Sequence, residues 1–397
     1  MSIILIIVFS IPMLSLVWWI WAHRQLHRLG ADACWKLAMA IGMITLLGGF
    51  LWTIANRMAW LEDPIPEKLN ALILLWGLLF LPMMALPLMF GWMIVSLAKR
   101  ALERAISRSA TELKLPTQCS TNRRKLLGML ALLAPVAGTF GATAYGLRQL
   151  RHFRIRRITV ELADLPEGLD GMIITHLTDT HVGKFCHGKF LRHLTEAVND
   201  LKSDLTLFTG DLIDFQIDDL REGVEMMRGI KPRSGIFMVE GNHDIADDRE
   251  GFYRQVRASG IPLLLNEAAT IRVRGVPVQI LGISWSRRDE GTDRNVDDVA
   301  ALREDGAFPI LLAHHPHAFD QAAKHGIPLT LAGHTHGGQL MVSKDIGAGP
   351  LLFRYWSGLY RKGRSALVVS NGAGNWFPLR VHAPAEIIHL TLKRASA

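Results

Sequence analysis

Hydrophobic and polar residues follow two different patterns along this chain of 397 residues. The first 150 residues contain four long apolar stretches, each close to the roughly 20 helical residues that a hydrocarbon core of about 30 Å requires. The remaining residues alternate short apolar runs with turns and polar segments. We therefore predict a transmembrane region over 1–150 and a separate folded domain over 151–397. The four transmembrane helices are predicted near 2–22, 37–56, 70–97 and 126–147.

The last apolar stretch decides which side of the membrane the folded domain faces. It contains Pro135 and four glycines, and both residue types disfavour a helix, so whether it spans stays open. Lys and Arg concentrate in the preceding loop, 99–125, and short loops rich in these residues stay in the cytoplasm. With four spans the domain lies outside the cytoplasm, although five arginines between 148 and 157 argue for the opposite orientation.

The net charge of +8 at pH 7 belongs to the transmembrane region alone. Residues 1–150 carry 14 Lys and Arg against 6 Asp and Glu, whereas 151–397 carry 30 basic and 30 acidic residues. A nucleic-acid-binding domain concentrates positive charge on its folded part, so no nucleic-acid-binding surface is expected. The spans contain almost no charged residues, which argues against a transporter, because transport pathways place polar groups inside the membrane.

Short apolar runs alternate with helical stretches throughout 151–397. This alternation predicts an α/β fold in layers, with antiparallel strands closing the sheet edges. Strands are predicted over 155–162, 172–177, 205–208, 235–240, 261–265, 309–313, 329–332, 366–370 and 385–392, and a hairpin over 271–273 and 278–283. Helices are predicted over 190–201, 218–230, 249–259, 295–303 and 317–324.

Residues that bind metals gather directly after five of these strands. In open α/β sheets, ligands bind beyond the carboxyl ends of the strands, so these segments are expected to meet in one crevice. Carboxylates suit hard cations and imidazole suits zinc, iron and similar ions, which together indicate a divalent metal. The five segments are Asp179-Thr180-His181, Gly210-Asp211, Gly241-Asn242-His243-Asp244, His314-His315 and Gly333-His334-Thr335-His336.

Each of these motifs is common alone, but all five in this order are not expected by chance. Over about 170–340 the chain resembles the calcineurin-like metallophosphoesterase superfamily, whose signature is DxH, GD, GNHD, H and GHxH. The longer AGHTHGGQ and the later SNGAG (370–374) resemble its bacterial membrane-anchored or exported branch. The resemblance implies a four-layer α/β/β/α sandwich and a metal-dependent phosphoric ester hydrolase. Together with the orientation that four spans give, it places the domain on the periplasmic side of a bacterial inner membrane.

The resemblance also implies two divalent metal ions, with manganese, iron or zinc as the candidates. Its ligand set is Asp179, His181 and His336 for one ion, Asn242, His314 and His334 for the other, and Asp211 as the bridge. A shared carboxylate offsets the repulsion of two close cations, which activate a bridging hydroxide for attack on phosphorus. Only one of the adjacent His314 and His315 can point inward from a strand end, and the resemblance selects His314.

Within the GNHD motif, His243 is assigned to catalysis rather than to a metal. A histidine beside the metals protonates the leaving alkoxide or stabilises the phosphoryl group, and Asp244 is expected to orient its imidazole. In a later loop, Trp376 and Phe377 form either an apolar lip for a lipid tail or part of the core.

The leading hypothesis is a membrane-anchored dinuclear-metal phosphoesterase. Its partners are then the lipid bilayer and a phosphate ester, and a phosphodiester of a lipid or lipid-linked molecule is favoured because the domain is held at the membrane. One alternative is a nucleotide or other soluble phosphoesterase tethered to the membrane. Another is a non-catalytic membrane protein that senses metal or phosphate.

Overall fold

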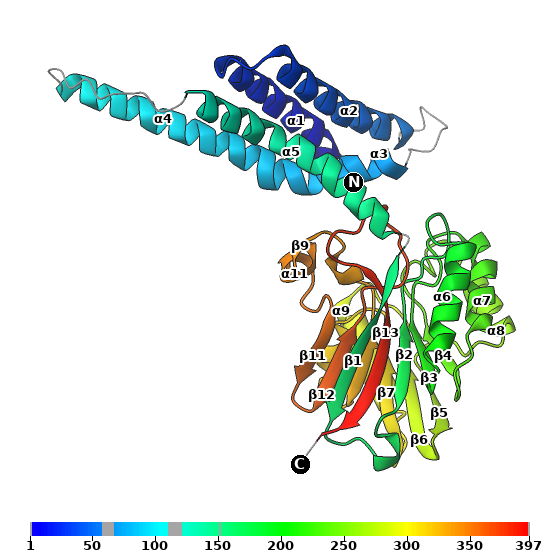
Figure 1. Ribbon diagram of the computed structural model, residues 1–397. Coiled ribbons are helices and arrows are strands. Elements are labelled where there is room, and N and C mark those ends of the chain that lie inside the picture. The colour runs from blue at the N-terminus through cyan, green and yellow to red at the C-terminus, as the bar shows by residue number, and fades with distance from the viewer. Residues whose placement is uncertain (1, 58–66, 110–120, 151, 396–397) are drawn as a thin grey trace. The chain divides into compact units, whose positions relative to one another are not determined.

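The computed structural model describes residues 2–57, 67–109, 121–150 and 152–395. The chain folds into two compact units, Met1–Leu147 and Arg148–Ala397 (Figure 1). Each unit has its own hydrophobic core.

The N-terminal unit consists of helices. They are α1 (Ser2–Arg28), α2 (Ala33–Arg57), α3 (Glu67–Leu75), α4 (Leu86–Ser109) and α5 (Thr121–Gln149), with a π-helical stretch, Trp76–Ala85, between α3 and α4. Pro82 lies in that stretch, where a wider helical turn accommodates its missing N–H. The rings of Trp18 and Trp76 are fully buried and meet edge to face at 5.6 Å.

Three helices in the described part of the chain are long and apolar enough to cross a membrane. They cover Ala33–Ala55, Lys68–Ala105 and Asn122–Gln149, and they correspond to the predicted segments 37–56, 70–97 and 126–147. The predicted span 2–22 falls in α1, where the side chains of residues 2–9 lie outside the described residues.

The third predicted span ends later than the sequence pattern indicates. Helix α4 continues past residue 97 to Ser109, so the first basic residues of the predicted 99–125 loop are helical. Lys99 pairs with Glu103 one turn later at 3.8 Å, a spacing that supports an exposed helix. Residues 110–120 of that loop lie outside the described residues.

The C-terminal unit contains two large sheets and a small hairpin. The first sheet has the order β1-β13-β2-β3-β4 and the second β11-β12-β8-β7-β6-β5, while β9 pairs only with β10. The strands are β1 (Phe153–Leu162), β2 (Ile173–Leu177), β3 (Leu205–Thr209), β4 (Ile236–Val239), β5 (Glu267–Val273), β6 (Val276–Gly282), β7 (Phe308–Leu312), β8 (Leu329–Ala332), β9 (Met341–Ser343), β10 (Ile346–Gly347), β11 (Gly358–Lys362), β12 (Ser365–Val369) and β13 (Ala385–Arg394). The helices are α6 (Lys189–Asp200), α7 (Leu220–Gly229), α8 (Arg249–Ala258), α9 (Asp289–Ala300), α10 (Ala318–Lys324) and α11 (Ala348–Leu352).

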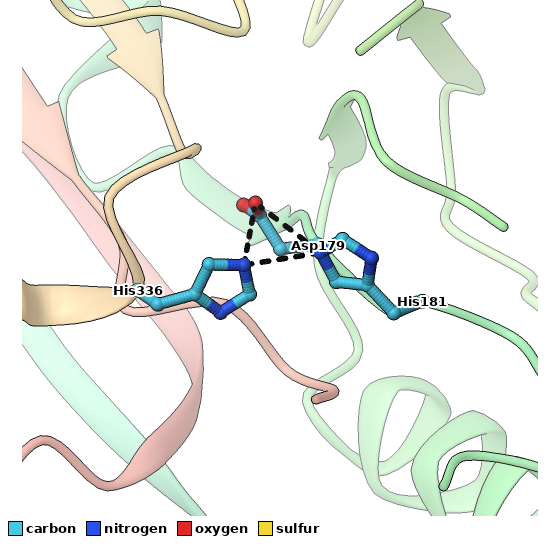
Figure 2. Close-up of side chains that lie close together, drawn as sticks. All are labelled: Asp179, His181 and His336. Carbon is cyan, nitrogen blue, oxygen red and sulfur yellow. Dashed lines mark hydrogen bonds and ion pairs between the residues drawn. The ribbon is translucent and has the colours of Figure 1, made fainter. Parts of the chain in front are cut away.

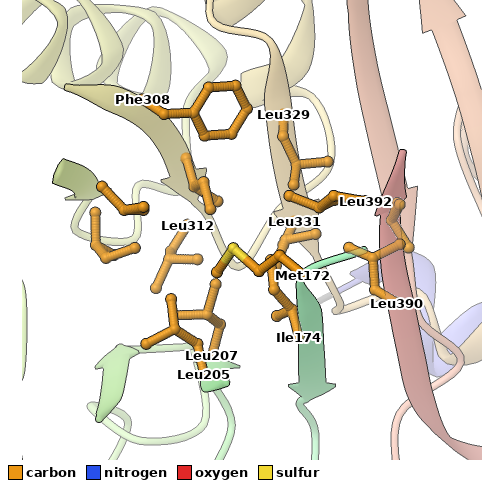
Figure 3. Packing of buried hydrophobic residues seen from close by; sticks show 14 of the residues in the cluster. Met172, Ile174, Leu205, Leu207, Phe308, Leu312, Leu329, Leu331, Leu390 and Leu392 are labelled. Carbon is orange, nitrogen blue, oxygen red and sulfur yellow. The ribbon is translucent and has the colours of Figure 1, made fainter. Parts of the chain in front are cut away.

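The two sheets face each other across the main core, and helices cover their outer faces. Ile174 and Leu207 of the first sheet pack against Leu312 and Leu331 of the second (Figure 3). Successive strand residues point to opposite faces, so Phe208 turns outward and packs with residues of α6, α7 and α8. Helices α9 and α10 cover the second sheet in the same way. The structure therefore confirms the predicted four-layer α/β/β/α sandwich.

Most predicted elements are present, and the differences lie in short or irregular segments. The predicted helix 295–303 begins earlier, at Asp289, where two acidic residues in its first turn suit the helix dipole. The predicted strand 261–265 is reduced to one bridge between Leu263 and Met238. The sequence pattern missed β9, β10, β11 and α11.

Candidate metal centre

The predicted site residues follow the carboxyl ends of five strands, as the motif spacing indicated. β2, β3 and β4 are parallel in one sheet, and β7 and β8 are parallel in the other. Directly after these strands the chain turns sharply, and the backbone of several residues is in the left-handed region. Non-glycine residues rarely adopt this conformation, and where they do, they are concentrated at functional sites. These residues are Asp179 (φ 51°), His181 (43°), Asp211 (56°), His334 (70°) and His336 (50°).

Two glycines allow the loops to approach the carboxylates. A Cβ at Gly241 would clash with Asp211 Oδ1, and a Cβ at Gly333 would clash with Asp179 Oδ2. The glycines of GNHD and GHTH are therefore required for close backbone approach.

One cluster joins the DxH motif to the last histidine of GHTH (Figure 2). Asp179 Oδ1 lies 3.3 Å from His336 Nε2 and 3.9 Å from His181 Nε2, and the two imidazole nitrogens are 3.0 Å apart. All three residues are buried. Each residue offers one ligand atom, and the three atoms lie within 4.8 Å of one another, as a metal site requires.

A second cluster lies beside the first and shares Asp211 with it. His314 Nε2 lies 3.2 Å from Asp211 Oδ2, 3.2 Å from Asn242 Oδ1 and 3.2 Å from His334 Nδ1. Asp211 Oδ2 is also 3.5 Å from His181 Nε2 in the first cluster. The structure thus brings together all seven predicted metal ligands, with Asp211 between the two groups.

Backbone contacts fix the direction of the ligands. His314 Nδ1 donates to Thr209 O at 2.7 Å, which leaves Nε2 facing the cluster. Both oxygens of Asp179 accept from His334 N, at 3.1 and 3.0 Å. His315 points elsewhere and packs its ring 4.7 Å from that of His334. Ligands held by such outer contacts are preorganised for an ion.

The electrostatics of the two clusters also suit cations. Burial alone raises the pKa of Asp211, but the surrounding histidines outweigh it and hold the carboxyl well below its usual pKa. Burial and the charge of His314 lower the pKa of His334 to about 3, and burial lowers that of His336 to about 4. The carboxylate is therefore ionised and these imidazoles are neutral, which is the protonation state of metal ligands.

The second cluster has a strong affinity for positive charge. Burial lowers the pKa of His314, but Asp211 beside it reverses the effect and raises the pKa to about 10. His314 Nε2 lies 3.2 Å from Asp211 Oδ2 and 3.2 Å from Asn242 Oδ1. The donor set of carboxylate, amide oxygen and imidazole fits a divalent cation, and the structure supports metal binding by these residues.

His243 lies at the edge of the clusters and is oriented by Asp214, not by the predicted Asp244. Its Nδ1 donates to Asp214 O at 2.5 Å and lies 3.3 Å from Asp214 Oδ1. The same carboxylate oxygen is 3.5 Å from His181 Nδ1. Asp214 therefore contacts one predicted ligand and the predicted acid together.

Asp244 has a different role, which corrects the prediction made for it. Its two carboxylate oxygens accept from four backbone N–H groups, those of Asp211, Leu212, Ile213 and Gly241, at 2.7–3.0 Å. Those groups follow a strand end and need acceptors because they are buried. Asp244 thus fixes the turn that presents Asp211.

Sequence reasoning also missed the support beneath His336. The fully buried Arg380 donates to Asn375 Oδ1 and to the carbonyls of Asn371, Gly374 and Ala383, and its Nη2 lies 3.0 Å from His336 Nδ1. A buried charge needs such partners. The residue type of Arg380 alone gives no sign that it is buried.

Two aromatic side chains flank His243 at the surface. The rings of Phe215 and Trp376 lie 4.0 and 5.9 Å from the imidazole. They are 49% and 41% exposed, so Trp376 belongs to the rim of the site and not to the core. The exposure of Trp376 excludes the core interpretation for this residue, whereas Phe377 is half-buried.

Comparisons with known proteins agree with this geometry. Residues 172–338 match the family described as calcineurin-like phosphoesterase. A Danio rerio protein named transmembrane protein with metallophosphoesterase domain is 29% identical over 376 residues, which is 91% of this chain and 81% of that protein.

Bacterial relatives match smaller shares of this chain. An uncharacterized metallophosphoesterase of Bacillus subtilis is 29% identical, covering 69% of this chain and 98% of its own length. One from Helicobacter pylori is 32% identical over 54% of this chain, and the chain spans 58% of its length.

Proposed function

We propose, from the premise that residues 172–338 belong to the calcineurin-like phosphoesterase family and that this chain is a metal-dependent phosphoester hydrolase, that it holds two divalent cations and cleaves a lipid or lipid-linked phosphodiester. The observation that carries the proposal is the position of Asp211. Its Oδ2 is 3.2 Å from His314 Nε2 in one cluster and 3.5 Å from His181 Nε2 in the other. A carboxylate shared in this way suits two adjacent cations.

The ligand set follows from the two clusters. Asp179, His181 and His336 hold one ion, Asn242, His314 and His334 hold the other, and Asp211 contacts both. Divalent cations bound here supply the hydroxide nucleophile at neutral pH and neutralise negative charge on the phosphate. Imidazole and carboxylate together favour manganese, iron or zinc.

His243 provides the acid for the leaving group. Its Nδ1 is held by Asp214, which leaves Nε2 as the atom that carries the transferable proton. Burial lowers the pKa of His243, but Asp214 and Asp211 outweigh this and raise it, so the ring keeps its second proton more readily. Transfer of that proton from Nε2 to the departing alkoxide completes cleavage.

The substrate class is inferred from the surroundings of this acid. Phe215 and Trp376 flank His243 and are partly exposed, which provides an apolar contact for a leaving group that carries a lipid. The apolar helices of the N-terminal unit favour a substrate presented at a membrane. A nucleotide or other soluble ester is the alternative, since aromatic rings also stack on bases.

The domain is proposed to face the periplasm of a bacterial inner membrane. The basic loop 99–125 is assigned to the cytoplasm because it is rich in Lys and Arg. One helix, Asn122–Gln149, follows this loop and is apolar enough to cross the membrane, so the domain after it lies on the opposite side. A reporter fused after Leu150 is expected to register outside the cytoplasm, and one fused at residue 112 inside. The reverse pattern would contradict the orientation.

Turnover by the purified full-length protein tests the activity. A panel of phospholipid diesters, lipid-linked diphosphates and nucleotides, each assayed with manganese, iron and zinc, is expected to show hydrolysis of a lipid-bearing diester. Hydrolysis of nucleotides alone would favour a tethered soluble-substrate enzyme. Metal binding without turnover of any ester would favour a non-catalytic sensor.

A further inference from the structure

Residues 341–353 form a small segment beside the metal centre that exposes large apolar side chains. It consists of the hairpin β9–β10 and helix α11 (Figure 1). Val342, Ile346, Leu351 and Leu352 are 47%, 58%, 82% and 67% exposed. Leu351 is the most exposed large apolar residue in the described part of the chain, the membrane-crossing helices included. Apolar groups gathered in this way mark a surface that binds a partner or a membrane.

The segment is fixed to the turn that carries His336. Helix α11 packs against His336–Gly338, and a Cβ at Gly338 would clash with the backbone N of Gly349. Ala348 N also donates to Leu340 O at 3.0 Å. The fold itself therefore holds these apolar side chains in solvent, because the backbone that carries them is tightly packed.

The same part of the domain receives the chain from α5. Leu150, the residue after α5, accepts a hydrogen bond from Asn375 Nδ2 at 3.0 Å. Asn375 begins the loop 375–381, and carbonyls of that loop accept from Gln339 Nε2 and Met341 N. Hydrogen bonds thus lead from the end of an apolar helix to the start of the exposed segment.

Basic groups line a cavity of about 560 Å³ that borders this segment. Lys344, on the connection between β9 and β10, lines it with Arg154 and Arg156 of β1, so three basic side chains stand against one acidic side chain, that of Asp345. Each guanidinium has five N–H donors. Buried Glu386 engages two from Arg154 and one from Arg156, and Ser357 Oγ accepts another from Arg156 at 3.0 Å. Donors on both arginines are left for an anion.

The cavity also offers an acceptor. Asn371 lines it, and the buried Oδ1 of this residue has no hydrogen-bond partner in the described part of the chain. Its Nδ2 donates to Pro384 O at 3.2 Å, which sets the orientation of the amide. A ligand with phosphate oxygens and a hydroxyl donor fits both kinds of group.

We propose that segment 341–353 docks on the surface of the bilayer into which α5 inserts, with an anionic phospholipid headgroup in the cavity lined by Arg154, Arg156 and Lys344. Interfacial elements combine exposed apolar residues with Lys and Arg in this manner, and anionic lipids strengthen their binding. Docking holds the rim of the metal centre at the membrane surface, whichever ester is hydrolysed.

Site-directed fluorescence on the full-length chain in nanodiscs tests the docking. Cys34 and Cys119 are replaced by serine, while Cys186 is kept because it is buried and burial raises the pKa of its thiol to about 12, which makes it unreactive. A polarity-sensitive dye is attached at Leu351→Cys. The matched control is Leu302→Cys, which is 48% exposed and lies between α9 and the amino end of β7.

The dye at 351 is expected to emit at a shorter wavelength than the dye at 302 and to be quenched by doxyl-labelled lipids. The dye at 302 is expected to be quenched only by aqueous iodide. Lipid quenching at 351 is expected to be greater in phosphatidylglycerol discs than in phosphatidylcholine discs, and Lys344→Gln should reduce that difference. Equal iodide quenching at 351 and 302 without lipid quenching would overturn the docking. Equal lipid quenching in both lipids would overturn the headgroup site.

The number of chains in each disc separates docking on lipid from contact between copies. Nanodiscs that hold one chain exclude contact between copies, so shielding of residue 351 only in discs with two chains would assign the surface to a second copy and overturn the proposal. The fluorescence readout requires no turnover. A failure of the docking is therefore distinguishable from a failure of the proposed lipid hydrolysis.

Discussion

The backbone carbonyl of Asp214 accepts a hydrogen bond from His243 Nδ1 at 2.5 Å, and the carboxylate of the same residue lies 3.3 Å from that nitrogen. Asp214 therefore sets both the direction and the charge of the imidazole. Asp214 belongs to none of the sequence motifs. It contacts His243 only because the chain after Asp211 folds back over the site.

Replacing Asp214 is expected to slow catalysis without emptying the metal centre. Asp214→Asn keeps the backbone acceptor but removes the negative charge beside His243, so the rate on alkyl esters should fall by about 10–100-fold, the usual effect of an outer partner. Asp218→Asn, a nearby exposed change, serves as control. Rates within twofold of the native enzyme for both variants would contradict the role of Asp214.

His243→Ala should separate the acid from the metal ligands. The variant is expected to retain its metal and to lose on the order of 10²–10⁴ in rate on an alkyl ester, as expected for loss of general acid catalysis. The loss should be smaller for a nitrophenyl ester, whose leaving group departs without protonation. Metal analysis beside rates on both esters gives the result, and equal losses or a loss of metal would show that His243 acts otherwise.

His334→Ala is the matched comparison for that variant. Its Nδ1 lies 3.2 Å from His314 Nε2 in the second cluster, so its removal should lower metal content and slow both esters alike. A variant that keeps its full metal content would remove His334 from the ligand set.

Arg380 is expected to support the fold around His336. Arg380→Met leaves four buried acceptors without their donor, and each unsatisfied buried group costs about 1–3 kcal/mol. The thermal midpoint of the detergent-solubilised full chain should therefore fall by many degrees. Arg361→Met, which removes one exposed bond to Glu161 O, should change it little, and similar midpoints for the two variants would refute this role.

Asp320 gives a pH-dependent contribution to stability. Burial raises its pKa, but Lys362, Tyr355 and Arg354 outweigh this and hold the pKa below the usual value of 3.8. The folded state thus binds fewer protons than the unfolded state, so the stabilisation is complete above about pH 5 and is lost as pH falls through the folded pKa. Asp320→Asn should lower the thermal midpoint at neutral pH, and this difference should shrink below about pH 4. A difference that stays constant down to pH 3 would contradict the ion pairs.

The sequence was sufficient for features that depend on pattern and spacing. Strand ends such as that of β3 were visible because an apolar run stops at Gly210-Asp211, and parallel strands then bring their carboxyl ends together. The orientation of the Asp244 side chain was not predictable, because its carboxylate accepts hydrogen bonds from buried N–H groups about 30 residues away along the chain. Segment 341–353 was missed because its strands and helix are too short to show a period.

Metal analysis of Asp211→Asn beside the native chain tests the central claim most directly. Both proteins are prepared at full length, reconstituted with manganese and analysed for bound metal per chain and for ester hydrolysis. Two ions per native chain are expected, with at most one ion and no measurable turnover in the variant, because the shared carboxylate contacts both clusters. Two ions and native rates in Asp211→Asn, or a single ion in the fully active native chain, would contradict the dinuclear site.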